Sequence, residues 1–143
     1  NNPQATAEVM KDGWLYTGDI GKIDNDGNVF ITGRKKDMIL TKGQNIFPSD
    51  IEGVLSNHPK VAEVAALAMP DELRGEVVGV VIRLRQGEEV TESEIKRFCL
   101  ENLANYKVPK QVYFVDFSLR TASGGIDKEI IRERLSIPPV FPK

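Results

Sequence analysis

The sequence predicts an α+β fold, a small lobe in which a central β-sheet of about three strands is flanked by helices and preceded by a β-hairpin. Two apolar runs rich in β-branched residues, 61–69 and 77–84, have the composition of central strands, because such side chains pack well on a pleated surface. Apolar residues at helical spacing around Ile95 and around Ile130 predict two amphipathic helices. Strands and helices mixed in this order are typical of a compact α+β lobe.

The N-terminal segment predicts a short helix or loop followed by a hairpin. Residues 3–12 are polar, with weak helical periodicity. Residues 20–32 contain two strand-like arms around a turn at 24–28, where Asp26-Gly27 is a strong turn signal because glycine tolerates positive φ. This turn is rich in carboxylates but lacks the ligand spacing of a calcium loop, so we expect no metal there.

Further along the chain, residues 37–40 predict a short strand. Ser49 and Glu52 then have the capping-box pattern that opens a helix. We expect this helix to end at His58-Pro59, because the residue before proline avoids helical backbone angles. Residues 112–115 predict a further strand.

Two residues with reactive side chains are expected to be structural. His58, the only histidine, lies at the predicted helix break, and we expect an exposed loop residue there and not a catalytic one. Cys99 lies on the apolar stripe of a helix that begins with a second capping box at 91–94. We therefore expect Cys99 to be a buried small hydrophobe and not a nucleophile.

The composition excludes several classes of protein. With 143 residues, of which 41% are hydrophobic and 28% charged, the chain fits one ordinary soluble domain. A net charge of −2 with both signs interspersed favours neither a nucleic-acid nor a membrane surface. No stretch approaches the roughly 18 apolar residues of a transmembrane segment. A single cysteine excludes an internal disulfide and fits a reducing compartment, so we expect a cytoplasmic protein.

Two polar clusters, 16–19 and 33–37, lie on opposite arms of the predicted hairpin. A carboxylate at Asp19 and a guanidinium at Arg34 can converge there on one polar ligand. Asp19 can accept hydrogen bonds from two neighbouring hydroxyls, while Arg34 donates to oxygens from a planar fork. This combination suits a ribose with a phosphate close by. From the residues alone, a turn-capping aspartate and a solvated charge run remain open as alternatives.

Several motifs in order resemble the adenylate-forming superfamily, which contains acyl-CoA synthetases, adenylation domains of peptide synthetases, and luciferases. The motifs are Gly13-Trp14-Leu15-Tyr16-Thr17-Gly18-Asp19, Gly33-Arg34-Lys35-Lys36-Asp37-Met38-Ile39, Lys42-Gly43-Gln44-Asn45-Ile46-Phe47-Pro48 and Ile51-Glu52. The resemblance covers nearly the whole chain, from about residue 2 to residue 135. It implies an enzyme with a large N-terminal lobe and a small, mobile C-terminal lobe.

The resemblance divides this chain between the two lobes. Residues 1–36 resemble the tail of the N-terminal adenylation lobe, including its hairpin and hinge, and residues 37–143 resemble the mobile C-terminal lid domain. Lys36 falls on the hinge position, and a hinge needs only one or two residues that absorb a large backbone change. Because the chain begins without methionine inside this motif region, we interpret it as a fragment whose partner is its own N-terminal lobe.

The resemblance also implies the reaction and its ligands. In the family, a carboxylate attacks the α-phosphate of ATP to give an acyl-adenylate and pyrophosphate, and a thiol, usually of coenzyme A, then displaces AMP. Asp19 falls at the position that holds the ribose hydroxyls, and Arg34, Tyr16 and Thr17 fall at other nucleotide positions. The expected ligands are therefore ATP or AMP, CoA and a carboxylic acid, with Mg²⁺ expected through the missing lobe.

Two further positions are candidates for contact with CoA. Gly43 falls in the loop that the family brings to the active site for thioester formation, where a glycine lets the backbone approach the thin pantetheine arm. An ordinary turn at a strand end is the alternative for Gly43. Lys107, in Tyr106-Lys107-Val108-Pro109, matches a stretch common in the small lobe and is a candidate for CoA phosphates, since a point charge suits phosphate. A solvated turn is the alternative for Lys107.

One expected catalytic residue is absent. The family loop Thr-Ala-Ser-Gly-Lys corresponds here to residues 121–125, and Gly125 occupies the position of the lysine that bridges the attacking carboxylate and the α-phosphate. Losing such a donor typically costs on the order of 10²–10³ in rate. Three explanations remain open: an altered residue, a natural variant specialised for thioester formation or binding, or substitution by Lys128. Lys128 lies inside the predicted last helix, so we expect its ammonium to start from a different direction.

Three functions follow from these expectations. The first is the C-terminal part of an AMP-forming acyl-CoA synthetase, with a fatty acid as the expected substrate. The second is an adenylation domain of a peptide synthetase, and the third is a non-catalytic homologue, which Gly125 favours. We expect the fragment alone to be inactive, because the acyl pocket and the phosphate-binding loop belong to the missing lobe in this family.

Overall fold

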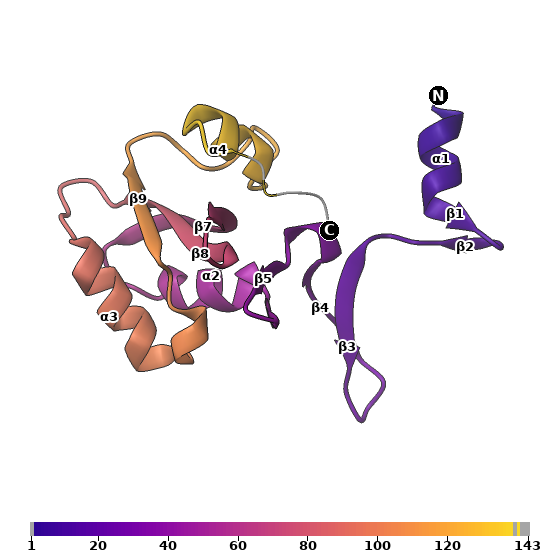
Figure 1. Cartoon of the computed structure of the whole chain (residues 1–143), viewed down its shortest axis with the longest axis horizontal. Coiled ribbons are helices and arrows are strands. Elements are labelled where there is room, and N and C mark those ends of the chain that lie inside the picture. The colour runs from indigo at the N-terminus through magenta and orange to yellow at the C-terminus, as the bar shows by residue number, and fades with distance from the viewer. Residues whose placement is uncertain (1, 139, 141–143) are drawn as a thin grey trace. The chain divides into compact units, whose positions relative to one another are not determined.

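The computed structural model describes residues 2–138 and 140, and the chain divides into two compact units, Asn1–Lys36 and Asp37–Lys143 (Figure 1). Strand pairing stays within each unit. The assignment of these units to the two lobes of one enzyme stays a prediction.

The N-terminal unit consists of one helix and two antiparallel strand pairs. Its elements are α1 (Pro3–Val9), β1 (Met10–Lys11), β2 (Trp14–Leu15), β3 (Asp19–Ile23) and β4 (Val29–Arg34). β1 pairs with β2, and β3 pairs with β4 to form the predicted hairpin. The predicted short helix and hairpin are therefore confirmed.

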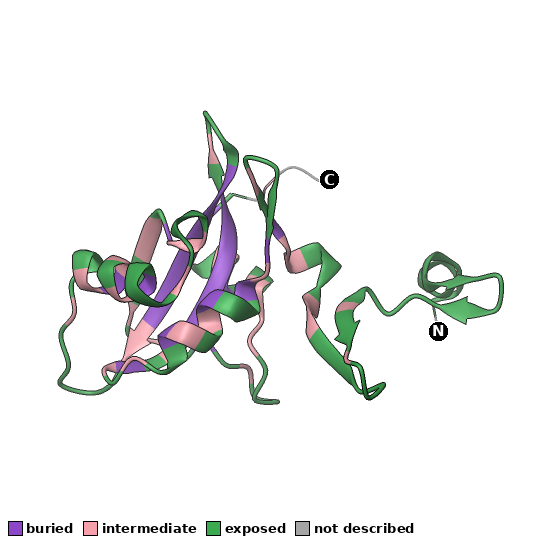
Figure 2. Ribbon diagram, turned by 90° about the horizontal axis from the view of Figure 1, so that it is seen from below, coloured by how far each residue is buried: buried purple, intermediate pink, exposed green. Residues whose placement is uncertain are grey.

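The N-terminal unit has no buried core. None of its described residues, 2–36, is buried, and Figure 2 shows this part of the chain in the colours of exposed and intermediate residues. Trp14, Ile23 and Val29 are 74%, 72% and 66% exposed. Large apolar side chains of the N-terminal unit are therefore left uncovered by the described part of the chain.

The C-terminal unit is built on a five-stranded sheet in the order β6-β5-β8-β7, with β9 also paired to β8. The strands are β5 (Ile39–Thr41), β6 (Gln44–Ile46), β7 (Val61–Asp71), β8 (Gly75–Leu84) and β9 (Gln111–Val115). β7 and β8 form a long antiparallel hairpin, and β9 runs parallel to β8. The predicted strands β7, β8 and β9 are confirmed, but β7 lies at an edge of the sheet and not at its centre, because it pairs with β8 alone. The short β5–β6 hairpin enlarges the sheet.

Three α-helices, α2 (Pro48–Ser56), α3 (Glu92–Asn102) and α4 (Lys128–Arg134), cover the two faces of this sheet. Alternate residues of β7 point to opposite faces, as strand geometry requires. One set packs with α2 and α3, in a core that includes Ile51, Val64, Ala66, Ile95 and Cys99. The other set packs with α4 and the segment before it, in a core that includes Ala65, Leu67, Met69, Leu119 and Ile131. Burial on both faces explains why β7 and β8 read as nearly continuous apolar runs.

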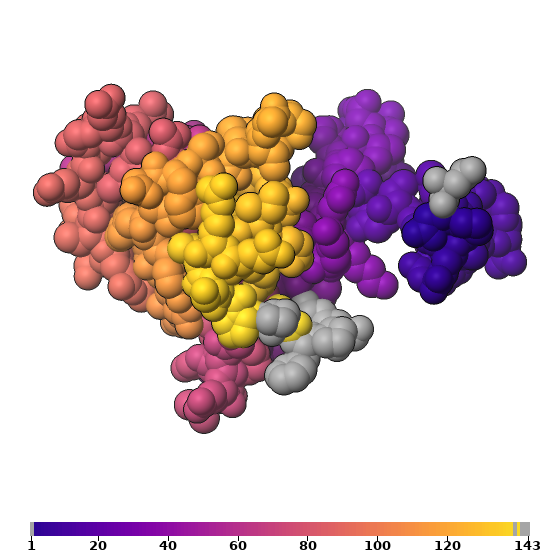
Figure 3. All heavy atoms as spheres, turned by 90° about the horizontal axis from the view of Figure 1, so that it is seen from above, coloured from indigo at the N-terminus to yellow at the C-terminus, as the bar shows by residue number. Residues whose placement is uncertain are grey.

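In Figure 3 the atoms of the C-terminal segment, orange to yellow, gather on one face of the C-terminal unit. The outer edge of β7, which pairs with β8 alone, is contacted by side chains of α2 and α4. The Glu52 carboxylate accepts a hydrogen bond from the Ala66 amide (2.9 Å), and the Arg132 guanidinium donates to the Ala68 carbonyl (2.5 Å). Side chains of α2 and α4 thus occupy backbone groups that no neighbouring strand satisfies.

Two predictions about the start of the C-terminal unit are wrong. Asp37 belongs to the 3₁₀ turn η1 (Lys35–Asp37), so the strand begins at Ile39 and not at 37. Ser49 and Glu52 do not form a capping box, because the helix begins two residues earlier than that pattern requires, with Pro48 at its first position and Phe47 as N-cap. Proline suits that position because its fixed φ is already helical. The second capping box, between Thr91 and Glu94, is confirmed.

The two residues expected to be structural are held in the core and beside it. Cys99 is fully buried, and burial raises the pKa of its thiol to about 11, so it carries no thiolate at neutral pH. His58 is half-buried and not exposed as predicted. Its ring packs edge-on against Phe98 (4.8 Å between centroids), and its Nδ1 accepts a hydrogen bond from the Lys60 amide (3.3 Å). No helix among the described residues is long and apolar enough to cross a membrane.

Candidate functional site

Asp19 and Arg34 lie directly opposite each other in the β3–β4 hairpin. Arg34 Nε is 3.4 Å from Asp19 Oδ1, and the side chains are 62% and 30% exposed, respectively. An ion pair this exposed contributes about 0–1 kcal/mol to stability, so folding alone gives little reason for it. The hairpin therefore presents a carboxylate and a guanidinium side by side at its surface.

The residues before Asp19 fix the backbone around it. The Thr17 hydroxyl accepts a hydrogen bond from the Asp19 amide (3.1 Å), and the Gly18 carbonyl accepts one from the Lys35 amide (2.8 Å). Gly18 has a φ of +76°, which glycine adopts without strain. Tyr16 is 59% exposed, and the Lys11 ammonium lies over its ring, 6.0 Å from the centroid. Lys36, the predicted hinge, is exposed and is the last residue of the N-terminal unit.

Gly43 forms the tip of the β5–β6 hairpin together with Lys42. Both residues have positive φ, +77° and +48° respectively, as a two-residue hairpin turn of this type requires. A Cβ placed on Gly43 would meet no atom within 4 Å. The backbone of this tip is therefore open to an approaching ligand.

Loop 121–125, which contains Gly125, is closed by its own hydrogen bonds. The Gly125 carbonyl accepts from the Thr121 amide (2.7 Å) and from the Thr121 hydroxyl (3.1 Å), while the Gly124 amide donates to the Thr121 carbonyl (2.9 Å). A Cβ at Gly125 would lie 3.9 Å from Thr121 Oγ1 and no closer to any other described neighbour. The position thus has room for a side chain.

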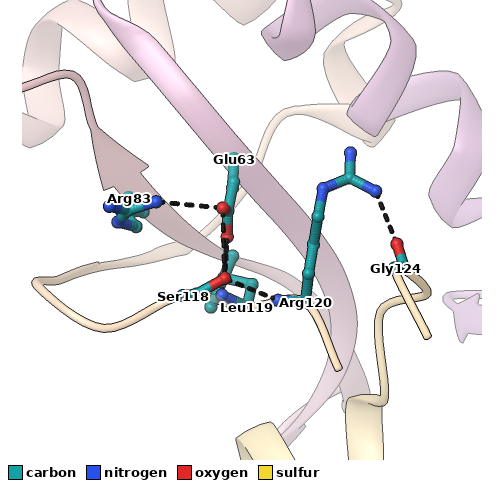
Figure 4. Close-up of polar contacts among 6 residues, drawn as sticks. All are labelled: Glu63, Arg83, Ser118, Leu119, Arg120 and Gly124. Carbon is teal, nitrogen blue, oxygen red and sulfur yellow. Dashed lines mark hydrogen bonds and ion pairs between the residues drawn. The ribbon is translucent and has the colours of Figure 1, made fainter. Parts of the chain in front are cut away.

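Glu63 ties the start of this loop to the sheet (Figure 4). Its carboxylate accepts hydrogen bonds from the Leu119 amide (2.6 Å), the Ser118 hydroxyl (3.2 Å) and the Arg83 guanidinium (3.0 Å). Partial burial raises the pKa of Glu63, but the hydrogen bonds from Leu119, Ser118 and Arg83 outweigh that effect and hold the pKa below its ordinary value. Glu63 is therefore a charged anchor for the polypeptide that enters the loop.

The same chain of contacts continues to the end of the loop. Ser118 Oγ accepts a hydrogen bond from the Arg120 amide (3.2 Å), and Arg120 Nη1 donates to the Gly124 carbonyl (2.7 Å). Figure 4 shows Arg120 reaching across to Gly124. Gly125 is thus held by contacts that begin on β7 and β8.

Lys128 and Lys107, the two lysines considered for roles in the reaction, are both in ion pairs. Lys128 Nζ is 3.0 Å from Glu52 Oε1, with the two side chains 17% and 24% exposed. Lys107 Nζ is 2.6 Å from Asp50 Oδ2 and is 21% exposed. Each pair joins α2 to a later part of the chain, so each lysine has a structural partner. Contact of Lys107 with CoA stays a prediction.

Sequence reasoning missed Glu63 and Glu76. Glu76 is only 8% exposed, and its Oε2 accepts a hydrogen bond from the Leu40 amide (2.8 Å). The available signal was a glutamate inside or beside each apolar run, 61–69 and 77–84. Such a residue needs a buried partner, because an isolated charge is costly to bury. In the described part of the chain, no group of three or more His, Cys, Asp or Glu side chains could hold a metal ion.

Residues 50–124 match the family described as AMP-binding enzyme C-terminal domain. The chain is 41% identical to a 2-succinylbenzoate–CoA ligase from Geobacillus sp. (strain WCH70), over 94% of this chain and 27% of the relative. It is 42% identical to the long-chain-fatty-acid–CoA ligase FadD13 from Mycobacterium tuberculosis (strain CDC 1551 / Oshkosh), over 95% of this chain and 27% of the relative.

Among solved structures, ATP-bound MatB from Rhodopseudomonas palustris aligns with a TM-score of 0.83 at 36% identity, over 92% of this chain and 26% of that protein. The chain therefore spans about a quarter of the length of each of these proteins.

Proposed function

This chain belongs to the AMP-binding enzyme C-terminal domain family, and from that premise we propose that it is the C-terminal part of an ATP-dependent acyl-CoA ligase. Residues 1–36 are then the tail of the N-terminal adenylation lobe, and residues 37–143 are the mobile lid. The reaction has two halves. A carboxylate oxygen bonds to the α-phosphorus of ATP as pyrophosphate leaves, and the CoA sulfur then bonds to the acyl carbon as AMP leaves and the thiol proton is lost.

The observation that carries this proposal is the pairing of Asp19 with Arg34 across the β3–β4 hairpin, 3.4 Å apart and open to solvent. In the proposed roles, Asp19 accepts hydrogen bonds from the two ribose hydroxyls and Arg34 donates to the same nucleotide. Thr17 holds the backbone of Asp19, and Tyr16 offers a ring beside it. The uncovered apolar side chains of residues 2–36 support packing against the rest of an N-terminal lobe.

Gly125 and Gly43 lie in loops that we assign to different half-reactions. Loop 121–125 acts in acyl-adenylate formation, in which a cation at position 125 would counter the negative charge on the α-phosphate. The Gly43 hairpin serves thioester formation by giving the pantetheine arm a path along bare backbone. Rotation about Lys36 exchanges one loop for the other.

Gly125 makes adenylation the weak step of this protein. Lys128 does not replace the absent cation in this proposal, because its ammonium is held by Glu52 at 3.0 Å. A protein with Gly125 is then better suited to the thioester half, or to binding, than to acyl-adenylate formation.

The acid substrate is proposed to be a fatty acid, on the likeness to FadD13. A second relative of nearly equal identity is named for 2-succinylbenzoate, so the C-terminal part alone does not discriminate between acids. Since no described acidic cluster here fits a metal, Mg²⁺ is assigned to the N-terminal lobe. We also propose a cytoplasmic location, in keeping with the single, buried thiol.

Two alternative functions can be tested in the same full-length protein. A peptide-synthetase adenylation domain would pass its acyl group to a carrier-protein thiol and not to CoA. A non-catalytic homologue, which Gly125 favours, would bind neither ATP nor CoA. Thioester formation is measured separately with CoA and with a carrier protein as the thiol acceptor. Product with the carrier protein alone favours the peptide-synthetase domain, and product with neither favours the non-catalytic homologue.

The test uses the full-length protein that contains this chain. Its affinity for AMP is measured by calorimetry in the wild type and in a Asp19→Asn/Arg34→Gln double variant, with Lys22→Gln/Asp26→Asn as a control of equal charge change on the same hairpin. We expect the first double variant to lose at least tenfold in affinity, about 1.4 kcal/mol, and the control to match the wild type. Absence of AMP binding in the wild type, or undiminished binding in the first double variant, would refute the proposal.

A further inference from the structure

The β5–β6 hairpin has few backbone links to the rest of the sheet. Its two strands pair with each other at three positions, but β5 meets β8 in a single register pair, Thr41 with Gly75. Gly43 lies only two residues beyond Thr41. The position of the hairpin tip therefore depends strongly on whatever fixes Leu40 and Thr41 against β8.

Glu76 supplies the second link. It follows Gly75 in β8, and its Oε2 accepts a hydrogen bond of 2.8 Å from the Leu40 amide. The two contacts, Thr41 with Gly75 and Leu40 with Glu76, are adjacent on both strands. Together they set both the distance and the rotation of the hairpin relative to β8.

A buried carboxylate is an unusual choice for this task. Glu76 is 8% exposed, and burying a charge is expensive unless its hydrogen bonds are good. The hairpin also has its own anchors in the core, Ile39 and Ile46, which are both fully buried. The core thus holds the hairpin at Ile39 and Ile46, and Glu76 adds a contact to β8 at Leu40, closer to the tip.

We propose that Glu76 is a positioning residue for the thioester half-reaction, in which it holds the β5–β6 hairpin so that Gly43 meets the pantetheine arm of CoA. This inference rests on the proposed function. Glu76 itself touches no reacting atom, and its effect passes through Leu40 to the tip. A shift of about 1 Å at such a position can reduce a rate on the order of 10²-fold.

The experiment separates the half-reactions in the full-length protein. Preformed acyl-adenylate and CoA are supplied, so that acyl-CoA formation is measured without the adenylation step that Gly125 impairs. Pyrophosphate release from ATP and acid is measured separately, in the Gly125→Lys background. Both assays are run on Glu76→Ala, Glu76→Asp and Glu76→Gln.

We expect Glu76→Ala and Glu76→Asp to reduce kcat/KM for CoA by about tenfold or more, because the first removes the acceptor and the second withdraws it by one methylene. Glu76→Gln keeps an acceptor oxygen and should restore most of the rate. Pyrophosphate release should stay within about twofold of its parent in all three variants. Glu76→Asp keeps the charge and most of the packing, so it tests the idea even if Glu76→Ala does not fold.

Asp71→Ala is the matched control. The Asp71 carboxylate also accepts backbone hydrogen bonds, from Leu73 (3.1 Å) and Arg74 (2.8 Å), but within the β7–β8 turn. It should leave thioester formation unchanged. Equal loss in both half-reactions, or a loss in Asp71→Ala equal to that in Glu76→Asp, would overturn the positioning role while the proposed function stands. A wild type that makes no acyl-CoA from acyl-adenylate would refute the proposed function, and this inference with it.

Discussion

Replacing Gly125 with lysine is expected to raise the rate of acyl-adenylate formation in the full-length protein by on the order of 10²–10³, the usual contribution of one preorganised donor at developing charge. At about 1.36 kcal/mol for each factor of ten, this corresponds to about 2.7–4 kcal/mol of transition-state stabilisation. The gain depends on the new ammonium reaching the α-phosphate from a loop that is already held in place.

The structure accommodates this substitution. A Cβ at position 125 meets only Thr121 Oγ1, at the ordinary van der Waals distance of 3.9 Å. Gly125 is not among the described glycines with positive φ, so an L side chain adds no backbone strain there. Replacing a glycine at a compatible position stabilises a protein by about 0.4–1 kcal/mol, because the unfolded chain loses freedom. Loss of stability should therefore not mask the gain in rate.

The assay is pyrophosphate release with ATP and a panel of acids, run on the wild type, Gly125→Lys and Gly125→Ala. The alanine variant adds the Cβ and stiffens the loop without adding charge, so it separates rigidity from electrostatics. A wild type as fast as Gly125→Lys would refute the reasoning, and so would full rescue by alanine. Lys128→Ala should leave the residual wild-type rate unchanged. A further fall would show that Lys128 supplies the cation.

Three more predictions concern stability and reactivity. Glu63→Ala should lower the free energy of unfolding, measured by urea denaturation, by about 1–3 kcal/mol, because the buried Leu119 amide loses its acceptor. Because the folded pKa of Glu63 lies below its ordinary value of 4.5, this contribution is complete above that pH and is lost as the pH falls through the folded pKa, so the difference between wild type and variant should shrink in acid. Cys99, with a pKa of about 11, should resist a thiol reagent in the native protein and react only after unfolding, and rapid native reaction would contradict its burial. Thr91→Ala should cost about 1 kcal/mol through loss of the N-cap, whereas Ser93→Ala, in the same turn, should cost less than half of that.

Local patterns predicted the elements of this fold well. The Asp26-Gly27 turn, the apolar runs of β7 and β8, and the capping box at Thr91 all depend on residues close in sequence. The capping box expected at Ser49 is absent because α2 starts at Pro48, two residues earlier than that pattern requires. Glu52 then points instead to Ala66 and Lys128, partners that lie on β7 and α4.

The site was harder to predict for the same reason. Placement of Asp19 and Arg34 on opposite arms of one hairpin was foreseen from the turn, but their direct pairing depends on a register shift between Ile20 and Gly21 that the turn does not set. The anchoring roles of Glu63 and Glu76 were not, because their partners Leu119 and Leu40 lie 56 and 36 residues away. The sequence shows that a charged residue lies in or beside an apolar run, but only the fold shows which backbone amide it binds.

The outer edge of β7 has a consequence for how the protein behaves in a crowded solution. A bare strand edge is a template on which another chain can add a strand, and proteins commonly block such edges. Here Glu52 and Arg132 already occupy the Ala66 amide and the Ala68 carbonyl. An edge blocked in this way offers no free backbone groups at Ala66 and Ala68 for an added strand, so this side of the C-terminal unit can face solvent without seeding aggregation.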